Sequence, residues 1–476
     1  MSSSSNKVVT RFAPSPTGFL HVGGLRTALY NYLFAKQNDG EMLLRIEDTD
    51  RERLVPGAIE KLISTLETMG ITYSGNPVIQ SERREIYHEH VLKLVENGDA
   101  YYCFCTKERL EKARSEQEAK KEPTKYDRCC RNLTSDEVTR RLAGGEPAVI
   151  RLLIPDGETT FIDIIRGEIT IPNSEVDDQV LWKTDGYPTY HLANVIDDHI
   201  MGVTHVIRGE EWISSVPKHI ILYKAFGWNI PKMTHVPLIL NPDRTKLSKR
   251  QGDVAVEDYL EKGYTVEALI NFIAMIGWNP GTEQEVFSMD DLIKVFDINR
   301  VHKAGGIFNV EKLDWLNREW IKKYSYDQQA DAMRPFLKDT NNFDEARFQK
   351  LVPLLIERIT TWEDIAKLRA DGEIDYFFSD PVYDLSLLMW KTQTRDYANA
   401  NLRHVYELLQ TYIGDWTNKN LHSLIWPYAE EKGRGDVLWP LRVSLSGKEK
   451  SPDPFTLLDF FGKDESLRRI ALALEK

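Results

Sequence analysis

A segment near the start of the chain, TRFAPSPTGFLHVGGLRTALYNYLF, places two prolines, three glycines and a histidine where a first strand gives way to a first helix. Ligands of open parallel sheets bind at the carboxyl ends of the strands, and Gly23 and Gly24 let a phosphate approach exposed N–H groups at a helix N-terminus. With His21 beside them, these residues predict a phosphate-binding turn. A tight turn with a surface histidine is the alternative interpretation of this segment alone.

A basic loop about 225 residues further on, KLSKR at 246–250, carries two lysines at positions i and i+3 after an expected strand. A lysine pair such as Lys246 and Lys249 can neutralise the charge that grows on a pyrophosphate leaving group. Basic pentapeptides are common, so a solvated loop is the alternative for this segment by itself.

Four cysteines stand in two close pairs, at 103 and 105 and at 129 and 130. They are too few and too clustered to form a disulfide scaffold for a chain of 476 residues, and their spacing suits a metal ion better. Two thiolates one residue apart can hold a metal from a strand turn. Reduced, partly buried thiols are the alternative. Both interpretations indicate a reducing compartment, and we expect the protein to be cytoplasmic.

The composition is that of a folded chain with an acidic balance of charge. Hydrophobic residues make up 42% and charged residues 28% of the 476, which excludes a disordered chain and allows roughly three globular units. No run approaches ~20 apolar residues, and the leader MSSSSNKVVT lacks an apolar core, so neither a membrane span nor secretion is expected. At a net charge of −12, a nucleic acid must be bound by local basic patches.

The elements that must position these residues follow an α/β pattern in the first half of the chain. Short apolar strands alternate with amphipathic helices from about residue 8 to 245. At about 100–180 this alternation is interrupted by a very polar helix and a segment rich in expected strands. After about residue 326 the apolar period is that of helices alone. We therefore expect an α/β fold, a Rossmann-type doubly wound parallel sheet with an inserted α+β domain, followed by an all-α C-terminal region. The expected domains are the first half of the sheet domain (1–100), the insert (101–182), the second half (183–245), a helical domain with the KLSKR loop (246–325) and the all-α region (326–476).

Taken together, HVGG at 21–24 and KLSKR at 246–250 resemble the HIGH and KMSKS signatures of class I aminoacyl-tRNA synthetases. The pairing is far more specific than either half. Three further segments are similar to one family among them, the glutamyl-tRNA synthetases: LRIEDTDRER, GYPTYHLANVIDDHIMGVTHVIRGEEW and PLRVSLSGKEKSPDPF. The similarity extends from about residue 8 to the end of the chain.

The resemblance implies a glutamate pocket, and the residue types suit that substrate. Glutamate carries two carboxylates and an ammonium, so its pocket needs charges of both signs. Arg11 and Arg208 are the implied carboxylate partners, although which arginine takes which carboxylate stays open, and Glu47 is the implied partner of the ammonium. The remaining residues implied for this pocket are Ala13, Ser15, Tyr190 and Asn194.

The family's reaction has two steps, in which the glutamate carboxylate first attacks the α-phosphate of ATP and the glutamyl group then passes to the terminal adenosine of tRNA(Glu). Mg²⁺ accompanies the ATP, and catalysis consists mainly of positioning and charge stabilisation. The resemblance places His21, Gly23 and Gly24 at the phosphates, with Trp212 near the adenosine. Lys246 and Lys249 would act on the departing pyrophosphate.

A structural zinc site and a tRNA interface are also implied. Cys103, Cys105, Tyr126 and Cys130 match the zinc ligands of some bacterial glutamyl enzymes, and Cys129 or water could replace the unusual tyrosine. In the helical C-terminal region, Arg358 is the candidate for an anticodon contact. We expect a monomer. An enzyme that also charges tRNA(Gln) is the alternative within the family, and a nucleotidylyltransferase is the alternative from another class.

Overall fold

The computed structural model describes residues 7–50, 53–247 and 255–475. It divides into two compact units, one formed by Met1–Leu260 with Val266–Leu313 and the other by Glu261–Thr265 with Asp314–Lys476. None of the described helices combines the length and the apolarity that a bilayer crossing requires.

The first unit is built on a sheet whose strands are parallel except for β7, which runs antiparallel to β6 at one edge. Its strand order is β3-β2-β1 on one side and β9-β10-β6-β7 on the other. The two parts meet where the N–H of Thr204, just before β9, donates to the carbonyl of Val9 on β1 at 2.9 Å. The strands are β1 (Val9–Phe12), β2 (Glu41–Ile46), β3 (Val78–Ile79), β6 (Glu158–Asp163), β7 (Gly167–Pro172), β9 (His205–Gly209) and β10 (Lys232–Val236). This confirms the parallel α/β sheet that the sequence predicts.

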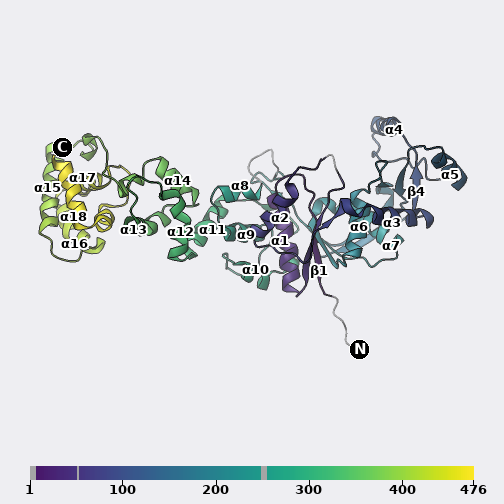
Figure 1. Ribbon diagram of the computed structural model, residues 1–476, viewed down its shortest axis with the longest axis horizontal. Coiled ribbons are helices and arrows are strands. Elements are labelled where there is room, and N and C mark those ends of the chain that lie inside the picture. Colours follow the sequence, from purple (N-terminus) through teal and green to yellow (C-terminus); the bar gives the residue numbers. More distant parts are fainter. Residues whose placement is uncertain (1–6, 51–52, 248–254, 476) are drawn as a thin grey trace, which may run out of the picture. The chain divides into compact units, whose positions relative to one another are not determined.

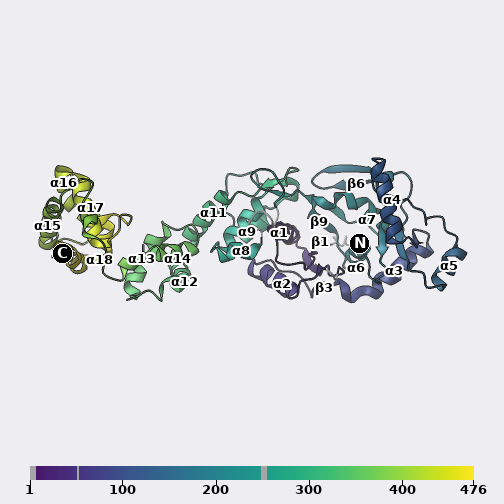
Figure 2. The same ribbon diagram turned by 90° about the horizontal axis from the view of Figure 1, so that it is seen from above.

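Helices cover both faces of this sheet (Figures 1 and 2). On one face α1 packs against β1 and β2, with α9 and α10 behind it; α6 and α7 lie on the other face. Helix α1 is apolar around much of its circumference, as its place between two layers requires, and Val22, Leu25 and Leu29 are completely buried. The helices of this unit are α1 (Val22–Gln37), α2 (Ala58–Thr68), α3 (Arg84–Glu96), α6 (Tyr190–Ile200), α7 (Val216–Ala225), α8 (Val256–Glu261), α9 (Val266–Met275) and α10 (Met289–Val295).

The expected insert contains an antiparallel sheet of its own, β4-β5-β8, with two polar helices. These elements are β4 (Ala100–Cys103), β5 (Val149–Leu152), β8 (Val180–Trp182), α4 (Lys107–Ala119) and α5 (Ser135–Ala143). One part of the range 101–182 differs from the expectation. The hairpin β6–β7 pairs with β10, where Met233 stands opposite Asp163, and so extends the parallel sheet of the surrounding domain.

The apolar run HVPLIL, which predicts one strand, is divided in two by Pro237. Proline has no N–H for the ladder, and β10 ends at Val236. The chain resumes as β11 (Ile239–Leu240), which pairs with β12 (Gly306–Ile307) instead of continuing the main sheet.

The regular elements in the described residues of the second unit are all helices, as the period of 3.6 residues predicts. Its core joins the apolar faces of all its longer helices, and α18 is interrupted at Gly462, where φ is +75°. The helices are α11 (Val310–Lys323), which crosses the boundary, α12 (Tyr326–Leu337), α13 (Glu345–Ile356), α14 (Glu363–Ala370), α15 (Arg395–Thr411), α16 (Asn418–Lys432), α17 (Arg434–Ser446) and α18 (Pro454–Glu475).

Candidate active site

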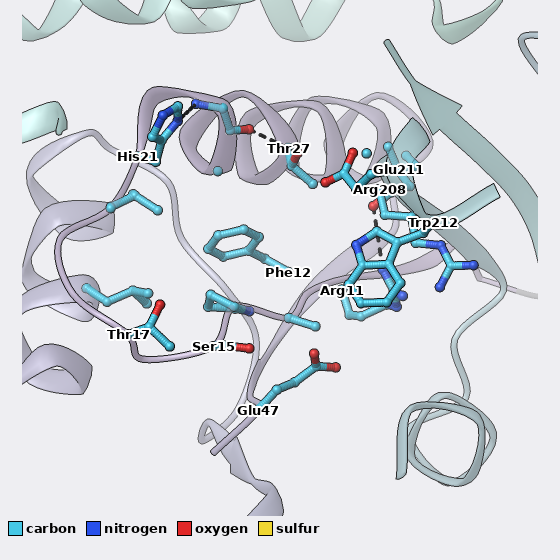
Figure 3. A pocket seen from close by; sticks show the side chains of 18 of the residues that line it. Arg11, Phe12, Ser15, Thr17, His21, Thr27, Glu47, Arg208, Glu211 and Trp212 are labelled. Atoms are coloured by element: carbon cyan, nitrogen blue, oxygen red, sulfur yellow. Dashed lines mark hydrogen bonds between the residues drawn. The ribbon is translucent and has the colours of Figure 1, made fainter. Parts of the chain in front are cut away.

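A cavity of about 380 Å³ opens where β1 and β9 end and α1 begins, the edge at which ligands bind in open parallel sheets (Figure 3). Most of the residues that the sequence assigns to glutamate and ATP line it together. They are Arg11, Ala13, Ser15, His21, Gly23, Gly24, Glu47, Tyr190, Arg208 and Trp212. Chain segments up to 200 residues apart therefore contribute to one site, as the motifs predict.

His21 is the N-cap residue of α1. Its Nδ1 accepts a hydrogen bond from the N–H of Gly23 at 2.9 Å, so the imidazole is oriented by the helix that it caps. This corrects one detail of the expectation, because Gly23 lies in the first helical turn and its N–H is bonded to His21. The glycines serve close packing: a Cβ on Gly24 would lie 3.0 Å from Leu20 Cδ1, and one on Gly23 would lie 3.2 Å from His21 Nδ1.

A second cavity, of about 320 Å³, adjoins the first and shares His21, Gly23 and Gly24 with it. Lys246 lines this second cavity, so the first lysine of the basic loop and the histidine of HVGG face one space. Glu211, which the sequence reasoning did not single out, lines both cavities. The other predicted lysine, Lys249, lies outside the described residues.

Arg11 enters the cavity wall from β1 and is almost completely buried. Its Nε donates to Asp198 Oδ1 at 3.0 Å, and Arg45 Nη1 reaches the same oxygen at 2.5 Å. Burial opposes the charge of Asp198, but the two guanidinium groups overcome that effect and hold the pKa of this carboxyl below its ordinary value. Arg11 is thus already paired with a carboxylate.

Glu47, just after β2, points its carboxylate into the cavity (Figure 3). Arg45 Nη2 donates to it at 3.1 Å, yet burial raises the pKa of Glu47. Asn194 differs from the other predicted pocket residues, because it lies behind the cavity wall. Its Oδ1 accepts from Arg45 Nη2 at 2.8 Å and from Arg11 Nη2 at 3.5 Å.

Arg208 lies on β9, where it is paired in register with His235 of β10. Its guanidinium donates to Tyr190 Oη at 3.1 Å, to His235 Nε2 at 3.1 Å and toward His219 Nδ1 at 3.3 Å. The Tyr190 ring lies against the indole of Trp212, with centroids 4.3 Å apart, and burial raises the pKa of this tyrosine. The Tyr190 hydroxyl therefore accepts from the arginine and keeps its proton to donate.

The cysteine cluster lies in the insert. The sulfurs of Cys103, Cys105 and Cys130 all lie within 4.8 Å of one another, which fits a single soft-metal ion. Tyr126 Oη lies 3.3 Å from Cys103 Sγ, and Cys129 Sγ lies 3.3 Å from Cys105 Sγ, so both candidate fourth ligands are within reach. A hydrogen bond with Cys130 and burial raise the pKa of the Cys103 thiol to about 12. A metal would therefore have to displace its proton.

Arg358 lies in the second unit, two residues beyond the end of α13, and forms an ion pair with Glu373. It lines a cavity of about 510 Å³ together with Arg442 and Lys450. Both of these belong to PLRVSLSGKEKSPDPF, one of the segments that carry the family resemblance.

Sequence reasoning missed three buried partners of the two pocket arginines, Asp198, His219 and His235, and also Arg45, which shares the Asp198 carboxylate with Arg11. A signal for them exists, since each is a polar residue at a position that the apolar pattern of its strand or helix places inside. What the pattern lacks is the identity of the partner, because these contacts join residues far apart in the chain.

Comparisons with known proteins agree with this geometry. Residues 7–315 match the family model of the catalytic domain of class I tRNA synthetases (E and Q), and residues 328–474 match an anticodon binding domain. The chain is 44% identical to a glutamate–tRNA ligase of Clostridium acetobutylicum and 44% identical to one of Chloroherpeton thalassium, in each case over 99% of both chains. Among solved structures, a glutamate–tRNA ligase of Elizabethkingia meningosepticum in complex with its amino acid aligns with a TM-score of 0.88 at 39% identity, covering 99% of each chain. The chain therefore belongs to the glutamate–tRNA ligase family of class I tRNA synthetases.

Proposed function

We propose that this protein activates L-glutamate with ATP and transfers the glutamyl group to the 3′-terminal adenosine of tRNA(Glu). The observation that carries the proposal is the meeting of Arg11, Arg208 and Glu47 in one cavity at the N-terminus of α1. The charges of Arg11, Arg208 and Glu47 match those of glutamate, and the N-terminus of α1, with Glu211 on the same cavity wall, lies where a phosphate would bind.

In the amino-acid pocket, Arg11 and Arg208 face the two carboxylates of glutamate and Glu47 faces the ammonium. Ala13 and Ser15 line the side between them, and Tyr190 offers its hydroxyl proton. Glutamine would be rejected because an arginine facing a neutral amide loses its charge-assisted partner. Asn194 acts from behind the wall by holding Arg11 and Arg45.

In the nucleotide site, His21 and the start of α1, kept compact by Gly23 and Gly24, face the ATP phosphates, while Trp212 lines the adenosine region. Lys246, with Lys249, neutralises the pyrophosphate as it leaves. Mg²⁺ bound with ATP would offset part of the charge on the phosphates that His21 and Lys246 face. The carboxylate of glutamate displaces pyrophosphate from the α-phosphorus, so the enzyme's task is to align the reactants and stabilise charge.

Zinc and tRNA complete the proposal. Cys103, Cys105, Cys130 and Tyr126 bind one structural zinc ion that stabilises the insert, and the three converging thiols support this site. Arg358 contacts the anticodon, supported by the cavity that it shares with two other cations. We further propose a monomer in the cytoplasm, where its four free cysteines stay reduced.

The test is glutamate-dependent exchange between ATP and pyrophosphate, measured with and without tRNA(Glu). We expect exchange with glutamate, no exchange with glutamine, and subsequent charging of tRNA(Glu). Exchange that ignores glutamate would indicate a nucleotidylyltransferase and overturn the proposal. Charging of tRNA(Gln) in parallel would identify the broader enzyme instead.

A further inference from the structure

Two buried histidines flank the Arg208 guanidinium on its inner side. His235 lies beside it on β10, and His219 projects from α7; they are 0% and 1% exposed. Each offers one ring nitrogen to the arginine, at 3.1 Å from Nε and 3.3 Å from Nη2. The arginine is therefore held at two of its nitrogens by rings from two different elements.

The chemistry of arginine determines the protonation of both rings. A guanidinium carries donors only, so the nitrogens that face it must accept, and a doubly protonated imidazole has no acceptor to offer. His235 therefore carries its proton on Nδ1, which donates to Asp163 Oδ2 at 2.7 Å. His219 carries its proton on Nε2, 3.1 Å from His191 Nδ1. Burial lowers the pKa of both rings, which agrees with neutral imidazoles.

The two pocket arginines differ in how their charge is compensated. Arg11 is paired with Asp198 at 3.0 Å. Around Arg208, within the part of the chain that the structure describes, no carboxylate oxygen lies within 4.0 Å of a guanidinium nitrogen. Asp163 is separated from it by the full width of the His235 ring and is further engaged by the N–H groups of Ile165 and Arg166.

We propose that His219 and His235 are positioning residues that hold Arg208 with neutral acceptors, so that its positive charge stays uncompensated until a substrate carboxylate arrives. Neutral acceptors orient a guanidinium without compensating its charge. A carboxylate in the same place would orient the guanidinium and also compensate its charge. The inference rests on the proposed function, because the charge in question is the one that glutamate meets. It also concerns specificity: the pocket selects a carboxylate because no carboxylate of the described chain pairs with Arg208 on its inner side.

The sharpest test compares His219→Asn with His219→Asp. Both side chains place an oxygen where Nδ1 of the histidine lies, and they have nearly the same shape, but only aspartate brings a negative charge to Arg208. We expect His219→Asn to keep KM for glutamate close to that of the wild type. His219→Asp should raise it about ten-fold or more, with KM for ATP nearly unchanged, because charge-assisted hydrogen bonds are about twice as strong as neutral ones.

A control pair keeps the effect specific to Arg208. His205 is also buried on β9, but it bonds to Thr204 and packs on Phe34. His205→Asp and His205→Asn should give the same KM for glutamate. If the two variants at position 219 also bind glutamate equally well while the wild type is active, the inference is overturned and the proposed function stands. A wild type without glutamate-dependent exchange would overturn the proposed function itself.

Should His219→Asp fail to fold, as judged by thermal melting, His219→Leu replaces it in the comparison. Leucine removes the acceptor without adding charge, so Arg208 loses one of its two inner contacts. We expect KM for glutamate to rise in the leucine variant and to be restored in His219→Asn. Equal KM values for these two variants would show that the ring only fills space.

Discussion

Glu47 is a buried acid that faces the cavity on one side and an arginine on the other. Arg45 donates to it from 3.1 Å, yet burial still raises the pKa of this carboxyl. A carboxylate whose charge is only partly satisfied by its surroundings gains from a second cation. An ammonium entering the cavity would supply that cation, which is the physical reason for matching the amino group of glutamate to Glu47.

Replacing Glu47 with glutamine should raise KM for glutamate by about 10- to 100-fold, because a hydrogen bond to a charged group contributes about 1.5–3 kcal/mol. KM for ATP should change little. Since the pKa of Glu47 is raised, the wild type should lose affinity for glutamate as the pH falls toward that pKa, and the variant should lack this part of the pH dependence. Steady-state aminoacylation at several pH values measures both effects. A parallel rise in both KM values would contradict the assignment.

Residue identities in the pocket were largely predictable from motifs, whereas their partners were not. Arg11, Arg208 and Tyr190 line the cavity as expected. Asn194 was expected in the same place but holds two arginines from behind, since a motif records which residue is needed and not which face it serves. Asp198 belongs to the segment GYPTYHLANVIDDHIMGVTHVIRGEEW, which carries the family resemblance, yet its ion pair with Arg11 arises only when the chain folds.

At the scale of elements, Asp198 connects α6 to two strands of the parallel sheet. Its carboxylate accepts from Arg11 on β1 and from Arg45 on β2, and all three side chains are nearly inaccessible to water. Removing one partner from a buried ion pair leaves an uncompensated charge inside the protein. The arrangement of strands that forms the cavity therefore depends on this helix residue.

Asp198→Asn should destabilise the first unit by about 3–5 kcal/mol. The pKa of Asp198 is lowered in the folded state, so its contribution to stability is present above the ordinary carboxyl pKa and is lost as the pH falls toward the lowered one. The difference between wild type and variant should therefore shrink in acid. Urea denaturation at neutral and acidic pH measures it, with Glu89→Gln, which breaks an exposed ion pair with Lys93, as the control. An unchanged stability at neutral pH would contradict the role given to this ion pair.

The insert depends on its metal if the thiol cluster binds zinc. Cys103→Ser should reduce the zinc content from one equivalent toward none and make the insert more sensitive to proteolysis, because a structural zinc contributes folding energy. Metal analysis with limited proteolysis measures both. Tyr126→Phe and Cys129→Ser then separate the two candidate fourth ligands: we expect the zinc affinity to fall in the tyrosine variant alone. A wild type without zinc would remove the site from consideration.

Local patterns predicted most elements but not their long-range pairing. Helix α4 follows from a polar composition rich in helix-forming residues, and the helices after residue 326 follow from periodicity; both signals are local. The hairpin β6–β7 was expected in the insert because it follows the cysteine region, whereas it pairs with β10, about 70 residues later. No pattern within the hairpin specifies that partner. By contrast, the end of β10 at Pro237 has a local cause that the sequence does contain.

On the scale of the whole molecule, the net charge of −12 and the proposed tRNA partner set a condition on where binding occurs. A polyanion is repelled by the average field of this protein, so it must be held where cations gather. The second unit offers a candidate, the cavity lined by Arg358, Arg442 and Lys450, whose three cations outnumber the two glutamates, Glu357 and Glu449, on the same wall. Its composition could be read from the sequence only in part, because Arg358 and the segment that carries the other two cations are about 80 residues apart.

The logarithm of the association constant for tRNA(Glu) should fall linearly with the logarithm of the salt concentration, with a slope of about −0.7 to −0.9 for each phosphate contacted. Arg358→Ala should weaken binding by about 5- to 100-fold, the range expected for an arginine that reads a base edge, while KM for glutamate stays the same. Arg334→Ala is the matched control, because Arg334 is also an arginine of the second unit paired with a glutamate, but it lies outside this cavity. Filter binding at several salt concentrations measures both quantities. A flat salt profile would contradict binding through the phosphate backbone, and equal losses in the two arginine variants would show that Arg358 contributes charge alone and reads no base.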